Sequence, residues 1–182
     1  MNNTPHTNCL TLRLLHAAKG YKAVAFDIFD TLLKRDCAHP ADLFALMEVT
    51  HQAALGFAEA RVAAEAETRQ TLGREVTLAE IYAHPALQGT DPAAECAAEL
   101  AMIAPNRPVA QAAAACHARG QKVYAVSDMY LPKEQIEAML QKCGLDFLDG
   151  VFVSCEYRVQ KRSGKLFKLF LQQTALRPAE VL

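Results

Sequence analysis

Several features that mark particular protein classes are missing from this 182-residue sequence. The formal net charge is only -1 and lysine and arginine form no block, so the composition gives no support for nucleic-acid binding. No run of about 18 apolar residues occurs, and the amino terminus has neither a cationic leader nor an apolar signal-peptide core. We therefore expect a cytoplasmic protein with no nucleic-acid partner and no membrane partner.

The six cysteines and six histidines are scattered along the chain and form no local cluster. No CxxC pair is present, so neither a zinc ribbon nor a thioredoxin-like redox motif is indicated. Without histidines at metal-ligand spacing, we interpret the histidines as structural. The cysteines are expected to be reduced thiols.

Strand-like and helix-like segments alternate along much of the chain. Because 52% of the 182 residues are hydrophobic, we expect one well-packed hydrophobic core rather than two independent cores. Alternation of strands and helices is typical of right-handed βαβ crossovers and a parallel sheet. The expected strands are 22–28, the apolar run within 121–130, and 150–154; the expected helices include 10–18, 109–118, 131–144 and 165–176.

An alanine- and glutamate-rich stretch interrupts this alternation between Pro40 and Arg107. Few β-branched residues occur there, which favours helix, and Thr77 with Glu80 matches a capping box. We therefore predict an all-helical insertion over residues 34–107. The α/β core would then consist of residues 1–33 and 108–182.

Polar residues follow three of the expected strands. Asp27 and Asp30 come after the first, Ser127 and Asp128 after the second, and Lys161 after the third. Taken singly, these residues have ordinary interpretations as turn residues, a helix cap and a solvated loop cation. Together, a carboxylate, a hydroxyl and a cation are the groups needed to hold a phosphoryl group beside a nucleophile.

The order of these motifs resembles the haloacid dehalogenase superfamily of hydrolases. The segment DIFDT at 27–31 matches that family's first motif, Ser127 its second, and KRSGKLF at 161–167 its lysine loop. The resemblance implies a Rossmann-like parallel sheet, with the insertion at 34–107 as a cap. The phrases FDIFDTLL and VSDMYLP also look like a subgroup of predicted hydrolases found alone or beside glycosyltransferase modules in surface-polysaccharide pathways.

The resemblance implies a role for each matching residue. Asp27 would attack the substrate and form an aspartyl intermediate, Ser127 would bind the transferring group, and Lys161 would neutralise charge. Thr31 and Asp128 would lie with the substrate. A phosphatase acting on a small phosphorylated molecule is the first functional hypothesis.

A cofactor is also implied by the phosphatase branch of this family. There, Mg²⁺ is held by the nucleophile, by the carbonyl two residues later, and by an acidic residue after a fourth strand. In this sequence the first two ligands would be Asp27 and the Phe29 carbonyl. The Mg²⁺ expectation is conditional, because no counterpart of the fourth motif occurs before Leu182.

The first motif departs from the phosphatase pattern at one position. Phe29 stands where the family's general-acid aspartate is expected, and Asp30 takes the usual glycine position. A halide leaving group needs no proton, and the dehalogenase branch has an aromatic residue at this position. A 2-haloacid dehalogenase is therefore the second hypothesis. Alternatively, Asp30 would move in as the general acid, which would keep a phosphatase efficient.

The resemblance also leads us to expect a core that is truncated before the family's fourth strand. The strand carrying Asp27 would then have an exposed edge, which the amino-terminal helix, another domain or another chain would cover. A domain that binds a partner without catalysis is the third hypothesis.

One candidate comes from the insertion itself. Arg61 lies among glutamates and would either reach an anionic substrate or form an ordinary surface ion pair.

Overall fold

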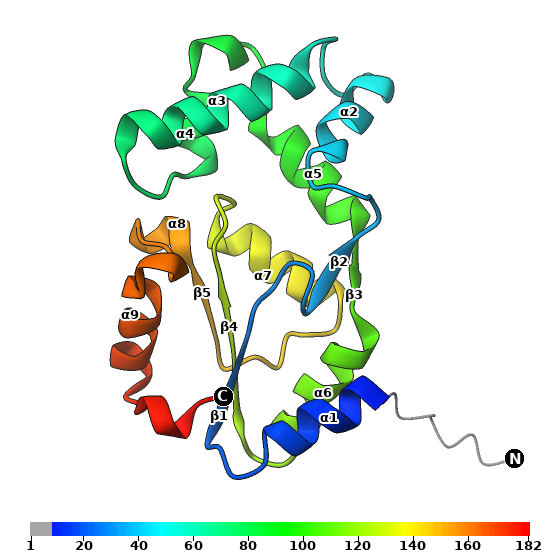
Figure 1. The fold of residues 1–182 in the computed structure, drawn as a ribbon. Helices are drawn as coiled ribbons and strands as arrows, with labels where there is room; N and C mark the ends of the chain where they lie inside the picture. The colour runs from blue at the N-terminus through cyan, green and yellow to red at the C-terminus, as the bar shows by residue number, and fades with distance from the viewer. Residues whose placement is uncertain (1–8) are drawn as a thin grey trace, which may run out of the picture.

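Three parallel strands form the central sheet in the computed structural model, which describes residues 9–182. Their order is β1–β4–β5, with β1 at Ala23–Phe26, β4 at Lys122–Ser127 and β5 at Gly150–Val153. Helices cover both faces of this sheet (Figure 1). The predicted α/β fold with a Rossmann-like parallel sheet is confirmed.

The alternation of side chains along the strands separates the two faces of the sheet. Val126 and Phe152 point to one face and pack with Leu166 and Phe170 of α9 (Lys165–Thr174). Val123 belongs to the larger core on the other face, which carries α1, α6 and α7. These helices span Cys9–Ala17, Arg107–Ala118 and Lys133–Lys142.

The insertion forms a helical layer above the carboxyl ends of the strands (Figure 1). Its capping box is as predicted, since the Glu80 amide donates to Thr77 Oγ1 and the Thr77 amide donates to Glu80 Oε2 at 2.9 Å. The helices of this layer, which we call the cap, are α2 (Asp42–Val49), α3 (Phe57–Leu72), α4 (Leu78–Tyr82) and α5 (Pro92–Met102), with a 3₁₀ turn, η1, at Pro85–Leu87.

A short antiparallel ribbon joins the cap to the core, and the sequence did not indicate it. Strands β2 (Leu33–Arg35) and β3 (Ile103–Pro105) pair with Leu33 opposite Pro105. Each strand has only three residues, too few for a period-two pattern to stand out. The insertion as predicted therefore contains parts of a β-ribbon as well as helices.

Hydrogen bonds hold the cap against the core. The Leu78 amide donates to the Tyr130 carbonyl at 2.8 Å, and Gln135 Nε2 donates to the Cys96 carbonyl at 2.6 Å. Lys142 Nζ donates to the Leu100 carbonyl at 2.6 Å. These contacts fix the cap over the strand ends that carry the candidate residues.

The edge of β1 opposite β4 is paired along its first residues. The Lys22 amide donates to the Glu180 carbonyl at 2.9 Å, and the Ala25 amide donates to the Leu182 carbonyl at 2.9 Å. Residues 180–182 thus lie beside β1 as a short parallel segment, with Ala23 bridged to Val181. The amino-terminal helix does not cover this edge, because α1 packs on α6 instead. Association with another chain or domain here stays a prediction.

The carboxyl-terminal third contains three short elements and an exposed phenylalanine. Phe167 of α9 is 44% exposed, because Leu166 and Phe170 already fill the sheet-facing side of this helix. Among helices of residues 9–182, none combines the length and apolar character needed to cross a membrane. The short elements are α8 (Ser154–Tyr157), η2 (Lys161–Ser163) and η3 (Pro178–Glu180).

Candidate active site

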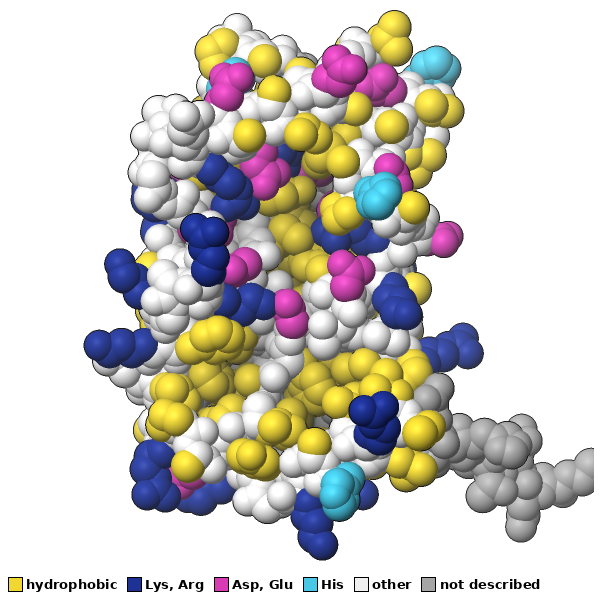
Figure 2. Space-filling view, in the orientation of Figure 1, with side chains coloured by type: hydrophobic (Ala, Val, Ile, Leu, Met, Phe, Trp, Pro, Cys, Tyr) yellow, Lys and Arg dark blue, Asp and Glu magenta, His cyan; other side chains and the backbone are white. Residues whose placement is uncertain are grey.

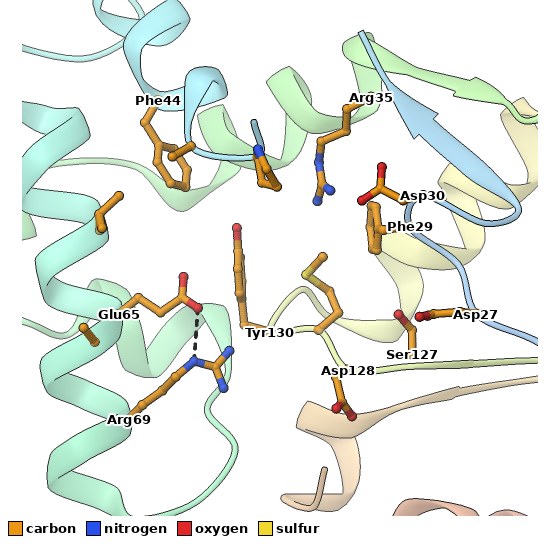
Figure 3. Close-up of a pocket in the computed structure, with 15 residues that line it drawn as sticks. Asp27, Phe29, Asp30, Arg35, Phe44, Glu65, Arg69, Ser127, Asp128 and Tyr130 are labelled. Carbon is orange, nitrogen blue, oxygen red and sulfur yellow. Dashed lines mark hydrogen bonds and ion pairs between the residues drawn. The ribbon is translucent and has the colours of Figure 1, made fainter. Parts of the chain in front are cut away.

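Asp27, Ser127 and Lys161 meet at the carboxyl end of the sheet. Asp27 directly follows β1 and Ser127 ends β4, which are neighbouring parallel strands, so both side chains reach the same edge. Lys161 begins η2, in the loop after β5, and its Nζ lies 2.7 Å from Asp27 Oδ2. Figure 3 shows the Asp27 carboxylate and the Ser127 hydroxyl side by side.

The Asp27 carboxylate is held but not enclosed. Its Oδ1 accepts a hydrogen bond from the Ile28 amide at 2.8 Å, while Oδ2 faces the Lys161 ammonium. The side chain is 42% exposed, so a substrate can reach it. A carboxylate fixed by one amide and one cation is suited to act as a nucleophile.

The Ser127 hydroxyl is available to a ligand. Ser127 is only 2% exposed, and its Oγ forms no hydrogen bond with any of residues 9–182. Every fully enclosed side-chain oxygen or nitrogen in the same range has a partner, so this Oγ keeps some exposed surface at the cleft that Ser127 lines. Figure 3 places it at the cleft beside Asp27.

Asp128 fixes the loop that carries Lys161. Both of its carboxylate oxygens accept from the Lys161 backbone amide, at 2.8 and 3.1 Å. Partial burial raises the pKa of Asp128, and the hydrogen bond and charge of Lys161 oppose part of that effect. Asp128 also lines the cleft, so it both positions Lys161 and borders the space beside Asp27.

Asp30 and Phe29 have the places that the sequence comparison indicated. Asp30 has a φ of 57°, in the left-handed region that favours glycine, and its exposed side chain lines the cleft. The Phe29 ring lies 4.0 Å from the Arg35 guanidinium carbon, as a cation–π contact. An aromatic ring rather than a carboxylic acid therefore stands beside Asp27 at this position.

A cleft of about 540 Å³ separates the cap from the strand ends. Figure 2 shows this hollow between the upper and lower parts of the molecule, with hydrophobic side chains inside it. On the cap side it is lined by residues of α2 and α3, among them Phe44, Val62, Glu65 and Arg69. Arg69 Nε lies 3.1 Å from Glu65 Oε1, and the guanidinium also pairs with Glu75.

Two of the predicted substrate-binding residues do not line the cleft. Arg61 is 0% exposed, and its Nε and Nη2 donate to Glu95 at 2.7 and 2.9 Å, in the interior of the cap. It is thus neither a substrate contact nor a surface ion pair, because α5 brings Glu95 over it. The Thr31 carbonyl accepts from Asn106 Nδ2 at 2.7 Å, so this residue ties β1's turn to the start of α6.

Four cleft residues with polar side chains were not singled out from the sequence: Arg35, Glu65, Arg69 and Tyr130. Tyr130 follows Ser127 in the segment VSDMY, and this closeness to the second motif could have marked it as a candidate. Arg35 lies just after the first motif and could have been identified in the same way. Glu65 and Arg69 form an i, i+4 pair that any exposed helix could carry, so no local signal marks them.

The residues present do not by themselves form a magnesium site. Asp27 and the Phe29 carbonyl would be two ligands, but residues 9–182 contain no cluster of three His, Cys, Asp or Glu side chains arranged to hold a metal ion. Mg²⁺ usually has octahedral oxygen coordination with several water ligands. We therefore assign no chemical step to a metal ion.

The solved structures that resemble this chain include both haloacid dehalogenases and phosphate complexes. An L-2-haloacid dehalogenase from Xanthobacter autotrophicus, with chloropropionic acid covalently bound, is 21% identical with a TM-score of 0.57, over 88% of this chain and 68% of that one. A haloacid dehalogenase (HAD) family enzyme from Bacteroides thetaiotaomicron, in complex with magnesium and inorganic phosphate, is 13% identical with a TM-score of 0.58, over 89% and 83%. At these identities the likeness shows a common fold.

A comparison with family models goes further than the structural likeness. No curated protein sequence matches the chain significantly. The model of the haloacid dehalogenase-like hydrolases, however, matches residues 21–182, which include all three motifs and the cap. This match confirms the resemblance inferred from the motifs, and the chain belongs to the haloacid dehalogenase-like hydrolase family.

Proposed function

We propose that this protein hydrolyses a small phosphorylated molecule through a covalent intermediate on Asp27. The observation that carries the proposal is the 2.7 Å contact between Asp27 Oδ2 and Lys161 Nζ, beside the open hydroxyl of Ser127. A carboxylate oxygen would attack phosphorus, the bond from phosphorus to the leaving oxygen would break, and water would then hydrolyse the aspartyl phosphate. Lys161 and Ser127 would bind the phosphoryl oxygens.

Phe29 limits the leaving groups that this site can expel. A positioned general acid is worth about 10²- to 10⁴-fold in rate, and a phenyl ring cannot supply the proton. Aryl and acyl phosphates leave as stable anions and need less protonation than alkyl phosphates. We therefore expect turnover of aryl and acyl phosphates to exceed that of alkyl phosphates by about this factor.

The charge of the site bears on its cofactor requirement. The carboxylates of Asp27, Asp30 and Asp128 border the cleft near a single lysine, Lys161. The cleft's two arginines are already paired, Arg35 with Glu99 and Arg69 with Glu65 and Glu75. A phosphate dianion would meet net negative charge here, which favours a requirement for an added cation such as Mg²⁺.

The test uses the purified chain with p-nitrophenyl phosphate and acetyl phosphate, with Mg²⁺ and with a chelator. We expect turnover that Asp27→Asn abolishes and that Asp30→Asn, a matched change in the same loop, largely retains. Intact-mass analysis after an acid quench should show one phosphoryl group on the wild type and none on Asp27→Asn. Loss of turnover in Asp30→Asn instead would identify Asp30 as a mobile acid.

Dehalogenation is the second candidate, because one specific contact favours it. The Phe29 ring and the Arg35 guanidinium 4.0 Å from it, which Glu99 neutralises, form a surface of low net charge beside Asp27. Such a surface suits a halide leaving group, which needs no proton. Chloride release from 2-chloropropionate in the presence of chelator would identify this activity, whereas its absence together with aryl phosphate turnover would exclude it. Absence of both activities would favour a domain that binds a partner.

A further inference from the structure

Tyr130 reaches from the core into the cleft with its ring firmly held. It follows the Ser127 motif, and it is only 9% exposed. Its carbonyl accepts from the Leu78 amide of the cap at 2.8 Å. The Arg61 guanidinium carbon lies 4.6 Å from the centre of its ring and 4.8 Å from that of Phe44. The position of the ring is therefore set by packing from both the cap and the core.

The hydroxyl of this tyrosine has no partner in the protein. Tyr130 Oη forms no hydrogen bond with any of residues 9–182, although enclosed polar side-chain atoms in this range all have partners. Its oxygen therefore keeps some exposed surface, and Figure 3 shows it extending into the cavity that Tyr130 lines. Tyr82 provides a contrast, since its hydroxyl donates to Glu95 Oε2 at 2.8 Å and its ring also lies near Arg61.

Arg35 presents a second open donor to the same cavity. Its Nε donates to Glu99 Oε2 at 2.9 Å and its Nη2 donates to Glu99 Oε1 at 3.0 Å. Both side chains of this pair are nearly buried. Its Nη1 has no acceptor within residues 9–182, and the residue lines the cleft with Tyr130. Figure 3 shows the guanidinium and the Tyr130 hydroxyl entering this space from different sides.

The charge of these donors limits what they can bind well. Glu99 is 1% exposed and already neutralises Arg35, so the pair offers N–H groups with little net positive charge. Burial raises the pKa of Tyr130 well above its usual value, so its hydroxyl stays protonated and can donate. A carboxylate or second phosphate would lose hydration here without gaining a free cation. A neutral oxygen loses much less.

We propose that Tyr130 Oη and Arg35 Nη1 form a specificity subsite that binds a neutral oxygen, a hydroxyl or a carbonyl, on the part of the substrate away from the reacting group. The subsite deepens the function proposed above and rests on it for the identity of the reacting group. It would select substrates by binding, so its effect belongs in KM rather than kcat.

Binding of non-hydrolysable phosphonates tests the subsite without relying on catalysis. The wild-type protein, with Mg²⁺ present, is titrated calorimetrically with benzylphosphonate, with its 3- and 4-hydroxy derivatives, and with 4-carboxybenzylphosphonate. We expect one hydroxy compound to bind about three- to tenfold more tightly than benzylphosphonate, as one net hydrogen bond allows. The carboxy compound should gain nothing.

Two variants separate the subsite from a structural role. Tyr130→Phe keeps the ring beside Arg61 and should remove the hydroxyl preference while leaving benzylphosphonate affinity unchanged. Tyr82→Phe, the matched control, should keep the preference. The proposal is overturned if Tyr130→Phe retains the preference, if it weakens all compounds equally, if the carboxy compound binds best, or if no phosphonate binds.

Parallel kinetics distinguish failure of the subsite from failure of the proposed function. The corresponding phenyl and hydroxyphenyl phosphates have leaving groups of similar acidity, so their KM values isolate the hydroxyl contact. A hydroxyl preference in phosphonate binding without any turnover would support the subsite and reject the phosphatase. Turnover with no hydroxyl preference would support the phosphatase and reject the subsite.

Discussion

Replacing Arg61 with methionine should strongly destabilise this protein, although Arg61 lies outside the cleft. Arg61 and Glu95 are both 0% exposed, and their two hydrogen bonds measure 2.7 and 2.9 Å. Burial would lower the pKa of Arg61, but the hydrogen bond and charge of Glu95 outweigh this effect and raise it, so the residue is charged. Removal of the arginine alone leaves a buried carboxylate without its counterion.

The expected magnitude follows from that unpaired charge. Removing one partner of a buried ion pair typically costs about 3–5 kcal/mol. In a protein of this size the melting temperature should fall by about 6–20 °C. The double variant Arg61→Met with Glu95→Gln should recover more than half of the loss, because glutamine is neutral and still accepts from Tyr82.

Urea unfolding followed by circular dichroism is the appropriate assay, because the chain contains no tryptophan. Arg74→Met is the matched control: Arg74 pairs with Glu80 at the surface, with its side chain 36% exposed, and should change stability by less than about 1 kcal/mol. A loss below about 1 kcal/mol for Arg61→Met, or a double variant less stable than Arg61→Met alone, would refute this account of the buried pair.

Three further outcomes are expected. Hydrogen bonding with Arg74 lowers the pKa of Glu80 from 4.5 to about 2, so the pair stabilises the folded state above pH 4.5 and loses this effect as the pH falls through about 2. Glu80→Gln should therefore lower the free energy of unfolding by about 1 kcal/mol or less at neutral pH. Denaturation measured as a function of pH should show this difference vanishing near pH 2. Asp30→Gly should raise the unfolding free energy by up to about 1 kcal/mol, because glycine adopts a φ of 57° without strain; an unchanged or lower urea midpoint would contradict this. Lys161→Met should lower kcat by about 10²-fold with an unaltered dichroism spectrum, since it removes the cation beside Asp27; unchanged turnover would exclude Lys161 from the chemistry.

In these expectations the core and the cap have different roles. The core presents Asp27, Ser127 and Lys161 from three strand ends, while the cap supplies walls whose charges are largely paired. The contacts Leu78 to Tyr130 and Gln135 to Cys96 hold the two parts together. Substrate selection should therefore depend on the few donors left open in the cleft.

Much of this arrangement could be predicted from local sequence signals. Apolar runs ended by Asp27 and Ser127 indicated parallel strands, and such strands bring their carboxyl ends to one edge. The Thr77–Glu80 capping box marked α4, and the resemblance of the first motif to the family's pattern indicated the glycine-like position of Asp30. Each of these signals depends on residues close together in the chain.

Other features depended on residues distant in sequence. Arg61 sits among glutamates on α3, which locally resembles a surface pair, but its main partner Glu95 is 34 positions away on another helix. The pairing of residues 180–182 with β1 likewise joins opposite ends of the chain. No local sequence pattern predicts which of these polar side chains become buried on folding.

The sequence by itself thus determined the main helices and the parallel strands, and it indicated Asp27 as the candidate nucleophile, because periodicity, turns and caps are local. Only the tertiary structure decided which charges are neutralised and which polar atoms remain open to a ligand. Arg61 and Tyr130 show the reason. Packing of the cap against the core buries one guanidinium with Glu95 and leaves one hydroxyl facing the cleft, and the solvation of each group depends on neighbours that only folding brings together.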